Sequence, residues 1–168
     1  MRAAQQGSAE ALETLFRWHW PRAHRAAYLV VHDAVAAEDI AQEAFLAAVR
    51  ALDRFDRSRP FGPWLHRIVV NRAIDFARAR ALRSEVEALE AASPSASEAS
   101  PGQPYSEELM AALARLSPEH RAVVVLRYLL EFTPGEIAGA LDLPRGTVNS
   151  RLRRGLDTLR VALAEEQP

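Results

Sequence analysis

Residues Thr133–Arg154 read TPGEIAGALDLPRGTVNSRLRR, and this stretch decides how the rest of the chain is interpreted. Its first half contains a complete helix start signal. Thr133 can cap a helix, Pro134 suits the first helical position, and Glu136 can close a capping box. Asp142 then marks a tight turn, because the backbone there tends to positive φ and aspartate tolerates that conformation. The pattern predicts two short helices joined by a turn.

The second of these helices has one apolar and one polar face. Its apolar residues recur at spacings of three and four and are expected to hold it against the first helix: Val148, Leu152, Leu156, Leu159 and Leu163. The residues expected to face outward are Arg145, Thr147, Asn149, Ser150, Arg151, Arg153 and Arg154. Such side chains bond phosphates and base edges. An isolated basic helix would be interpreted as solvated surface, but the capped helix and turn before it favour a DNA-reading helix-turn-helix.

The net charge of -1 conceals a segregated charge distribution. Residues 33–43 hold four acids and no basic residue, and residues 44–83 hold nine arginines and three acids. Residues 84–108 hold six glutamates and no basic residue. Blocks of this kind predict separate surfaces for different partners.

Composition narrows the class of protein further. No apolar run is long enough to span a membrane, and residues 1–7 lack the apolar core of a secretory signal, so a cytoplasmic location is expected. The absence of cysteine excludes disulfides and thiolate metal sites. The histidines are scattered, and glycine-rich phosphate loops and nucleophile elbows are absent. The sequence therefore predicts no enzyme and no cofactor.

Strand patterns are scarce, which predicts an all-α protein with two small helical domains joined by a flexible linker. The first domain is assigned to residues 1–83, with a kink or restart of its first helix expected at Pro21. A Ser- and Pro-rich acidic linker is assigned to residues 84–105 and the helix-turn-helix domain to residues 106–168.

Six phrases along the chain carry a family resemblance. They are AEDIAQEAF at 37–45, ALDRFD at 51–56, NRAID at 71–75, LSPE at 116–119, VVLRY at 124–128 and GTVNSRL at 146–152. In order and spacing they resemble bacterial RNA polymerase sigma factors of the extracytoplasmic-function (ECF) subgroup, which has two conserved domains. The resemblance implies binding to core RNA polymerase and to promoter DNA, both as duplex and as melted non-template strand.

The resemblance assigns roles to three groups of residues. Those expected to dock on the coiled-coil clamp of core polymerase are Asp39, Gln42, Glu43 and Phe45. Those expected at the minus-ten element are Arg54, Arg57, Arg59, Phe61, Trp64, Arg67, Asn71, Arg72 and Arg78, with Asn71 as the base reader. Those expected at the minus-thirty-five element are the seven outward residues of the last helix. Phe45, Phe55 and Trp64 can also be interpreted as core residues.

Several points stay open at this stage. The pair Gly62–Pro63 and the residue Asn149 depart from the family's usual pattern, so both promoter words are undetermined. The acidic linker would mimic nucleic acid near the polymerase's RNA path or act only as a tether. An anti-sigma factor is a common partner of similar proteins. The alternatives are a transcription regulator that binds duplex DNA through the helix-turn-helix alone, and a sigma-like interaction module without initiation activity.

Overall fold

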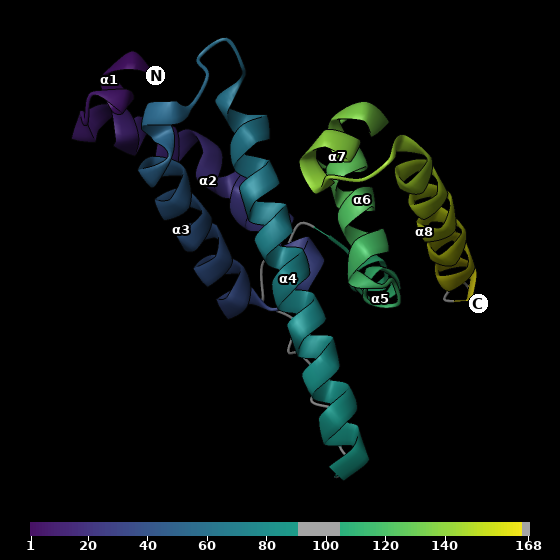
Figure 1. The fold of residues 1–168 in the computed structure, drawn as a ribbon. Helices are drawn as coiled ribbons and strands as arrows, with labels where there is room; N and C mark the ends of the chain where they lie inside the picture. Colours follow the sequence, from purple (N-terminus) through teal and green to yellow (C-terminus); the bar gives the residue numbers. More distant parts are fainter. Residues whose placement is uncertain (91–104, 166–168) are drawn as a thin grey trace.

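The computed structural model describes residues 1–90 and 105–165, with side chains described up to Ser84 in the first range. These ranges contain helices and no strand, as predicted. The helices of the first unit are α1 (Arg2–Gln5), α2 (Ala9–Val31), α3 (Ala34–Arg50), the 3-10 turn η1 (Leu52–Arg54) and α4 (Phe61–Glu90). Those of the second unit are α5 (Glu107–Ala114), α6 (Pro118–Tyr128), α7 (Pro134–Leu141) and α8 (Arg145–Glu165). The two units lie side by side (Figure 1).

Side-chain caps set the start of five helices. Each capping residue accepts a hydrogen bond from the backbone N–H three residues later, and these residues are Ser8, Asp33, Ser106, Ser117 and Thr133. A cap of this kind satisfies one of the donors that the first helical turn leaves unpaired. Short polar residues before each apolar pattern therefore define where these helices begin.

Two helix boundaries differ from the expectation. The predicted restart at Pro21 is wrong, because α2 runs as one helix from Ala9 to Val31 with the proline inside it. The buried second half of α2, which includes Ala26 and Ala27, packs in the core, and tertiary packing outweighs the local cost of a proline. Helix α4 runs on to Glu90, so its last turns lie within the segment assigned to the linker. The rest of that segment, 91–104, lies outside the described residues.

Small side chains bring the helices of the first unit close together. Alanines with almost no exposed surface line the contacts of α2 and α3, namely Ala23, Ala26, Ala27, Ala37, Ala41, Ala44 and Ala48. The side chains at a contact set the distance between packed helices, so alanine allows a close approach. Larger residues of α4, such as Leu65, Val69 and Val70, are fully buried and complete this core.

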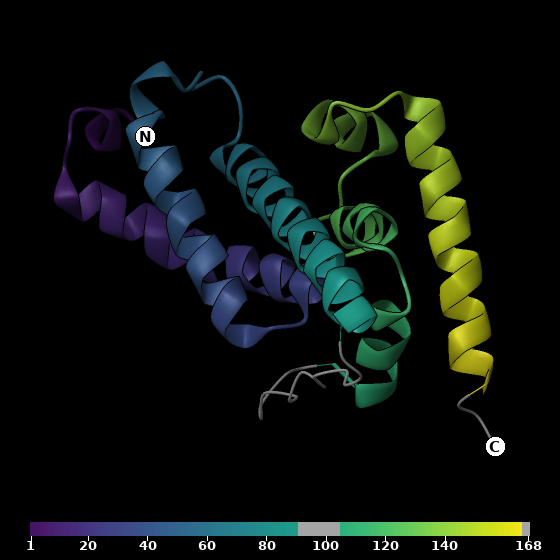
Figure 2. The ribbon, with the colours of Figure 1, turned by 60° about the horizontal axis from the view of Figure 1, so that its bottom comes forward.

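Helix α6 is the centre of the molecule. Figures 1 and 2 both show it between α4 and α8. Its residues 121–126 are all buried, so the helix has no solvent-exposed face over this stretch. A helix that is apolar on every side must be covered on every side. On one side it meets α8, and on the other it meets α2 and α4 of the first unit.

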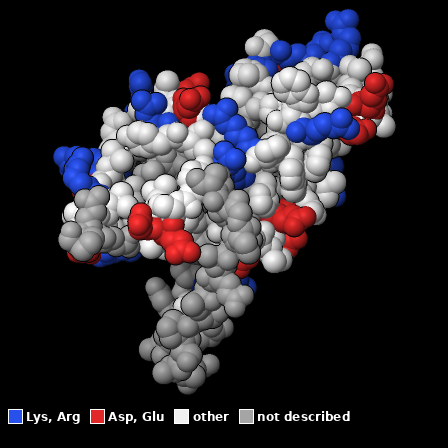
Figure 3. Space-filling model, turned by 180° about the vertical axis from the view of Figure 1, so that it is seen from behind, with Lys and Arg blue, Asp and Glu red and all other residues white. Residues whose placement is uncertain are grey.

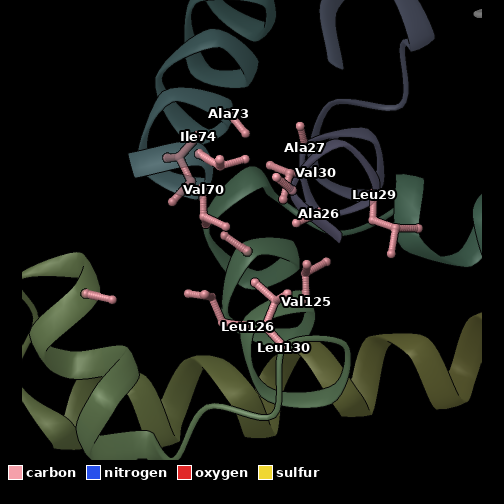
Figure 4. Close-up of a cluster of buried hydrophobic side chains, with 14 of the residues drawn as sticks. Ala26, Ala27, Leu29, Val30, Val70, Ala73, Ile74, Val125, Leu126 and Leu130 are labelled. Atoms are coloured by element: carbon pink, nitrogen blue, oxygen red, sulfur yellow. The ribbon is translucent and has the colours of Figure 1, made fainter. Parts of the chain in front are cut away.

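The contact between the units is an apolar cluster. Figure 4 shows Ala26, Ala27, Leu29 and Val30 of α2 and Val70, Ala73 and Ile74 of α4 gathered around Val125, Leu126 and Leu130. The cluster belongs to one continuous core that extends through both units. None of the described helices is long and apolar enough to cross a membrane.

Candidate nucleic-acid interface

The helix-turn-helix predicted from residues 133–154 is present. The Thr133 backbone N–H donates to Glu136 Oε2 at 2.7 Å, and the Glu136 N–H donates to Thr133 Oγ1 at 3.3 Å, which completes the capping box. Asp142 ends α7 in the left-handed conformation, with φ 53° and ψ 49°. The expected turn at a non-glycine residue is thereby confirmed, and it directs the chain into α8.

Helix α8 separates its two faces as the spacing predicted. Val148, Leu152 and Leu159 are buried, whereas the predicted reading residues Arg145, Asn149, Arg153 and Arg154 are exposed. The other predicted reading residues are half-buried: Thr147, Ser150 and Arg151. Among the described ion pairs, none involves an arginine of this face. This surface is therefore available to phosphates and base edges.

A glycine lets α8 sit directly on α6. A Cβ built on Gly155 would lie 3.0 Å from Val124 Cγ2 and 3.6 Å from the His120 carbonyl oxygen. Gly155 is buried within α8, where glycine is otherwise unfavourable. The sequence pattern did not single out this residue, although a glycine in the middle of an amphipathic helix indicates a close packing contact.

The predicted minus-ten arginines divide into two groups. One group has only local carboxylate contacts, and the other, Arg72 and Arg78, pairs with carboxylates of other helices. Arg54, Arg57 and Arg59 lie on η1 or the loop after it, and with Arg67 of α4 they are exposed. Their carboxylate contacts are local, 4.0 Å from Arg54 to Asp53 and 3.7 Å from Arg59 to Asp56. Exposed pairs of this kind contribute little, about 0 to 1 kcal/mol, so these cations remain available to a nucleic-acid backbone.

Three aromatic residues form the base of this loop. The ring centroids of Phe55 and Trp64 lie 4.7 Å apart, and those of Phe61 and Trp64 lie 5.6 Å apart. Phe61 is 9% exposed and packs in this cluster, where it supports the loop, and its expected contact with DNA stays a prediction. The expected burial of Phe55 is confirmed, and Trp64 is half-buried in the same cluster.

The predicted polymerase-docking residues lie beside an acidic cleft between α3 and α4. The cleft has a volume of about 510 Å³, and Asp33, Asp39, Glu43 and Asp75 line it. Arg72 also lines it and pairs with Glu43 at 3.0 Å, so a predicted DNA residue meets a predicted docking residue. Gln42 is exposed on the same helix.

Phe45 does not belong to that exposed surface. It is 6% exposed, and its ring lies 4.9 Å from Phe16 and 6.1 Å from Trp20 between centroids. The expected direct contact with polymerase is therefore not available to this side chain here. Its alternative interpretation as a core residue of α3 is the one that the structure supports.

Two other predicted minus-ten residues contact the second unit. The Asn71 side-chain amide donates to the Ala140 carbonyl oxygen at 3.0 Å, near the end of α7. Arg78 pairs with Glu119 of α6 at 2.6 Å between Nε and Oε1. The sequence placed Asn71 and Arg78 on a DNA-facing surface, and it contained no signal that α6 and α7 would contact them.

Arg121 is a central residue that the sequence pattern did not identify. It is 8% exposed and donates to the carbonyl oxygens of Leu113, Ala114 and Leu116, near the end of α5, and of Val30 in α2. Burial lowers the pKa of Arg121 to about 10, which leaves it charged at neutral pH. A cation at the carboxyl ends of two helices is favourable because their partial charges there are negative. The signal that could have identified Arg121 was its position as a single arginine at the edge of an otherwise apolar run.

Histidines and carboxylates do not assemble into a metal centre in the described part of the chain, where no three of them converge. His66 is buried, and desolvation, with smaller contributions from Arg22 and His19, lowers its pKa to about 4. A buried neutral imidazole of this kind is a packing element of the first unit.

The separate basic groups can be followed on the surface. Figure 3 shows arginines in several groups with acidic side chains between them, and the group at the left edge lies where α8 runs. The basic residues thus form no single continuous stripe on this face. Their division agrees with the segregated charge of the sequence.

Comparison with known proteins finds a matching family for each of the two units. The family "Sigma-70 region 2" matches residues 15–83, and the family "Sigma-70, region 4" matches residues 106–159. The chain is 32% identical to the ECF RNA polymerase sigma factor SigL of Mycobacterium tuberculosis, over 96% of this chain and 94% of that protein. It is 29% identical to the ECF RNA polymerase sigma factor SigW of Bacillus subtilis, over 98% and 95%. The solved structure of CnrH in complex with the cytosolic domain of CnrY superposes with a TM-score of 0.72 at 28% identity, covering 99% of this chain and 96% of that one.

Proposed function

Because the chain belongs to the ECF family of RNA polymerase sigma factors, which direct transcription initiation, we propose how its surfaces divide that work. The exposed acids of α3 dock on core polymerase. The loop before α4 and the basic face of α4 hold the melted minus-ten strand, and α8 enters the major groove at the minus-thirty-five element. The exposed basic face of α8, whose arginines form no ion pair within the described part of the chain, is the observation that carries this proposal, together with the capped α7 before it.

The acids of α3 suit a basic docking partner. Asp39 and Gln42 are exposed, and the cleft beside them is lined by four carboxylates. Complementary charge of this kind steers association and fixes orientation more than it adds affinity. Glu43 forms an ion pair with Arg72, so a polymerase that binds Glu43 would compete with Arg72 for it. Docking would thereby release Arg72.

The minus-ten surface suits a single strand. Opening a duplex costs unstacking energy, which a protein recovers by following the backbone with cations and by binding unstacked bases. Arg54, Arg57 and Arg59 line the exposed loop, and Asn71 offers an amide able to pair with a base edge. The role contains no catalytic step of the protein's own, and it belongs to the cytoplasm, where the polymerase works.

An anti-sigma factor is proposed as a further partner. The related CnrH was solved in complex with the cytosolic domain of CnrY, which supports a protein partner of this kind here. A partner that binds both units would have to fit the contact that they already make. Binding of such a protein to the purified chain, with loss of core polymerase binding, would support this part of the proposal.

The decisive experiment combines the purified chain with core RNA polymerase on a library of promoter fragments, with sequencing of the transcript starts. Promoter-specific initiation is expected and would reveal both promoter words. Binding to core without initiation would favour the sigma-like interaction module. Sequence-specific duplex binding without binding to core would favour the simple helix-turn-helix regulator.

Asn71→Ala is expected to impair promoter melting while binding to core polymerase survives, because the variant loses the proposed base reader. Permanganate reactivity of the unpaired thymines measures the bubble. Asn149→Ala is the matched control, since it removes the same amide from the other unit and should lower promoter affinity without lowering reactivity in bound complexes. Normal reactivity in Asn71→Ala would contradict the assignment.

A further inference from the structure

Gln5, the last residue of α1, holds the turn from which the proposed minus-ten loop starts. Its side-chain Nε2 donates to the Leu52 carbonyl oxygen at 2.9 Å and to the Phe55 carbonyl oxygen at 3.0 Å. Leu52 is the first residue of η1, and Phe55 directly follows it. An amide nitrogen carries two N–H donors, so Gln5 uses both of them on this one turn. Figures 1 and 2 show α1 at the end of the first unit where the loop lies.

The turn needs this support because its own hydrogen bonds are few. The Arg54 N–H donates to the Ala51 carbonyl oxygen at 3.2 Å, and the Phe55 N–H donates to that of Leu52 at 3.1 Å. A 3-10 turn has poorer hydrogen-bond geometry than an α-helix. Phe55 then leaves the helical conformation, with φ -70° and ψ 125°, and none of the described backbone N–H groups donates to its carbonyl oxygen. Gln5 therefore supplies the donor that this carbonyl would otherwise lack.

Gln5 is itself held in place by the way α1 ends. Gly7 has a φ of 84°, the Ser8 N–H donates to the Ala3 carbonyl oxygen at 3.0 Å, and the Gly7 N–H donates to that of Ala4 at 3.1 Å. Two such bonds around a left-handed glycine form a Schellman motif, which glycine adopts without strain. Ala4 is buried, and Gln5 is half-buried. The amide is therefore presented to η1 from a defined turn.

The turn also fixes the start of a loop that carries proposed strand-binding cations. These cations are Arg54, Arg57 and Arg59, and all three are exposed. Phe55 is held on two sides, because its ring lies 4.7 Å from that of Trp64 and its carbonyl oxygen is bound to Gln5. The loop thus starts from a backbone position that is fixed jointly by α1 and by the first turn of α4.

A fixed starting point favours the binding of a single strand. A loop that samples many positions loses conformational freedom when a strand binds, and this loss opposes binding. A loop held in one position has already lost that freedom, and it keeps its contacts in one relation to the bases. Both N–H donors of Gln5 are used on η1, so the residue contributes by positioning the loop and not by binding DNA.

We propose that Gln5 is a positioning residue for minus-ten recognition: its amide joins α1 to both ends of η1 and so fixes the loop that carries Arg54, Arg57 and Arg59. The inference rests on the proposed function of this loop. Loss of the amide leaves the arginines present but frees the start of the loop. The preference for particular minus-ten bases then weakens, because base contacts specify only when they are held in one arrangement.

Gln5→Glu tests the amide donors themselves. The variant keeps the size and shape of the side chain, but carboxylate oxygens only accept hydrogen bonds and cannot bind the two carbonyl oxygens. Gln6→Glu is the matched control, since it makes the same change at the next residue, whose side chain is exposed and forms none of the described hydrogen bonds. Gln5→Ala removes the donors without adding a charge and provides the same test without that repulsion.

The readout is initiation with core polymerase on the library of promoter fragments, because it reports both promoter words for each variant. The ratio of initiation on the preferred minus-ten word to that on its single-base variants should fall roughly three- to tenfold in both Gln5 variants. The corresponding minus-thirty-five ratio should not change, and Gln6→Glu should match the parent in both ratios. A merely structural role would lower initiation equally on all promoters and leave the minus-ten ratio unchanged. That result would overturn the inference.

Hydrogen exchange in the free chain checks the physical cause. The Arg54 and Phe55 amides, which donate within η1, should exchange roughly threefold or more faster in both Gln5 variants than in the parent and in Gln6→Glu. The amides of Val69 and Val70, in the buried part of α4, should keep their protection, which shows that the first unit is folded. Unchanged exchange in η1 would also overturn the inference, because the turn would then not depend on the Gln5 amide.

The two proposals fail in distinguishable ways. Initiation by the parent chain with core polymerase is measured first and tests the proposed function alone. If the parent initiates and the Gln5 variants keep its minus-ten ratio, only the positioning role fails. If the parent does not initiate, the proposed function fails and the inference falls with it.

Discussion

The DNA surfaces proposed on α4 and α8 are both basic, but their side chains are engaged very differently in the free chain. On α8, Arg153 and Arg154 are exposed and take part in none of the described ion pairs. On α4, Arg72 pairs with Glu43, and Arg78 pairs with Glu119 of the other unit. The surface proposed to read duplex DNA thus presents arginines that take part in none of the described ion pairs, whereas two arginines of the surface proposed to hold a melted strand are already paired.

This difference has a physical basis in what each surface binds. Duplex DNA is always present, and a rigid helix with free cations can bind it without rearrangement. A melted strand exists only during initiation, so a surface for it can be occupied by other groups until the polymerase and promoter displace them. Four predictions test this comparison, from the largest expected effect to the smallest.

Arg121→Met should cause the largest loss of stability, about 3 kcal/mol or more, because it removes a buried charged donor that four backbone carbonyl oxygens share. It should also weaken the contact between the units, since one of those carbonyls belongs to Val30. Urea unfolding measures the first effect. Arg160→Met, which changes an exposed arginine paired only with Asp157, should leave stability almost unchanged. Similar urea midpoints for the two variants would show that the hydrogen bonds of Arg121 contribute little to stability.

Arg154→Ala should weaken binding to minus-thirty-five duplex by about 1 to 3 kcal/mol, through loss of one base or phosphate contact. Arg154 is exposed, so its loss should not disturb the packing of α8 on α6. Titration of labelled minus-thirty-five duplex with the parent chain and the variant measures the loss. Arg160→Ala, farther along the same helix, is the control, and equal affinity of Arg154→Ala and parent would refute the assignment.

Gly155→Leu should displace α8 from α6, because a side chain there meets Val124 and the His120 backbone. Overpacking costs about 1 to 3 kcal/mol, partly offset by a gain in helix propensity of up to about 1 kcal/mol. Thermal unfolding and duplex titration should both show a loss. Gly139→Leu adds the same side chain to α7 where a Cβ meets nothing within 4 Å, and it should be neutral or slightly stabilising. A similar loss of stability and duplex affinity in both variants would mean that the close contact of Gly155 with α6 is not its cause.

Acid should destabilise the first unit through His66, whose pKa burial lowers to about 4, and through His32, whose pKa burial, then Arg121, lower to about 4. Unfolded histidine titrates near 6.5, so between about pH 6.5 and 4 the unfolded chain binds more protons. The free energy of unfolding should therefore decrease as the pH is lowered through that window, by up to about 1.4 kcal/mol per pH unit for each histidine. Unfolding in urea at several pH values measures the slope. His66→Gln should reduce it, with His24→Gln as the control; an unchanged slope would exclude His66.

Much of the fold was predictable because its signals are local. The caps at Ser117 and Thr133, the αL turn at Asp142 and the apolar spacing of α8 each depend on residues a few positions apart. The restart expected at Pro21 was wrong because packing of the second half of α2 outweighs the proline's local preference. Local rules hold where they agree with the tertiary contacts and fail where those contacts oppose them.

The candidate site was likewise predictable only where its signals are local. The exposed face of α8 follows from periodicity alone, since one apolar stripe determines the opposite face. The burial of Phe45 and Phe61 did not follow from their assigned roles at polymerase and DNA, because an aromatic residue at a half-apolar position packs wherever the core accepts it. Neither Arg121 nor Gly155 was identified, because each depends on a neighbour in another helix.

By itself, the sequence determined the helices, their caps, the helix-turn-helix and the segregation of acidic and basic surfaces, since all of these arise from contacts between residues close in the chain. Only the tertiary structure decided that α6 is enclosed by both units, that Arg121 binds carbonyls on both sides of the contact, and that Asn71 and Arg78 are engaged by α7 and α6. The apolar run in α6 required burial on every side, but a run of valines and leucine does not specify which surfaces cover it. Hydrophobic attraction is non-directional, so the partners were selected by shape and by the few directional bonds that only the folded chain brings together.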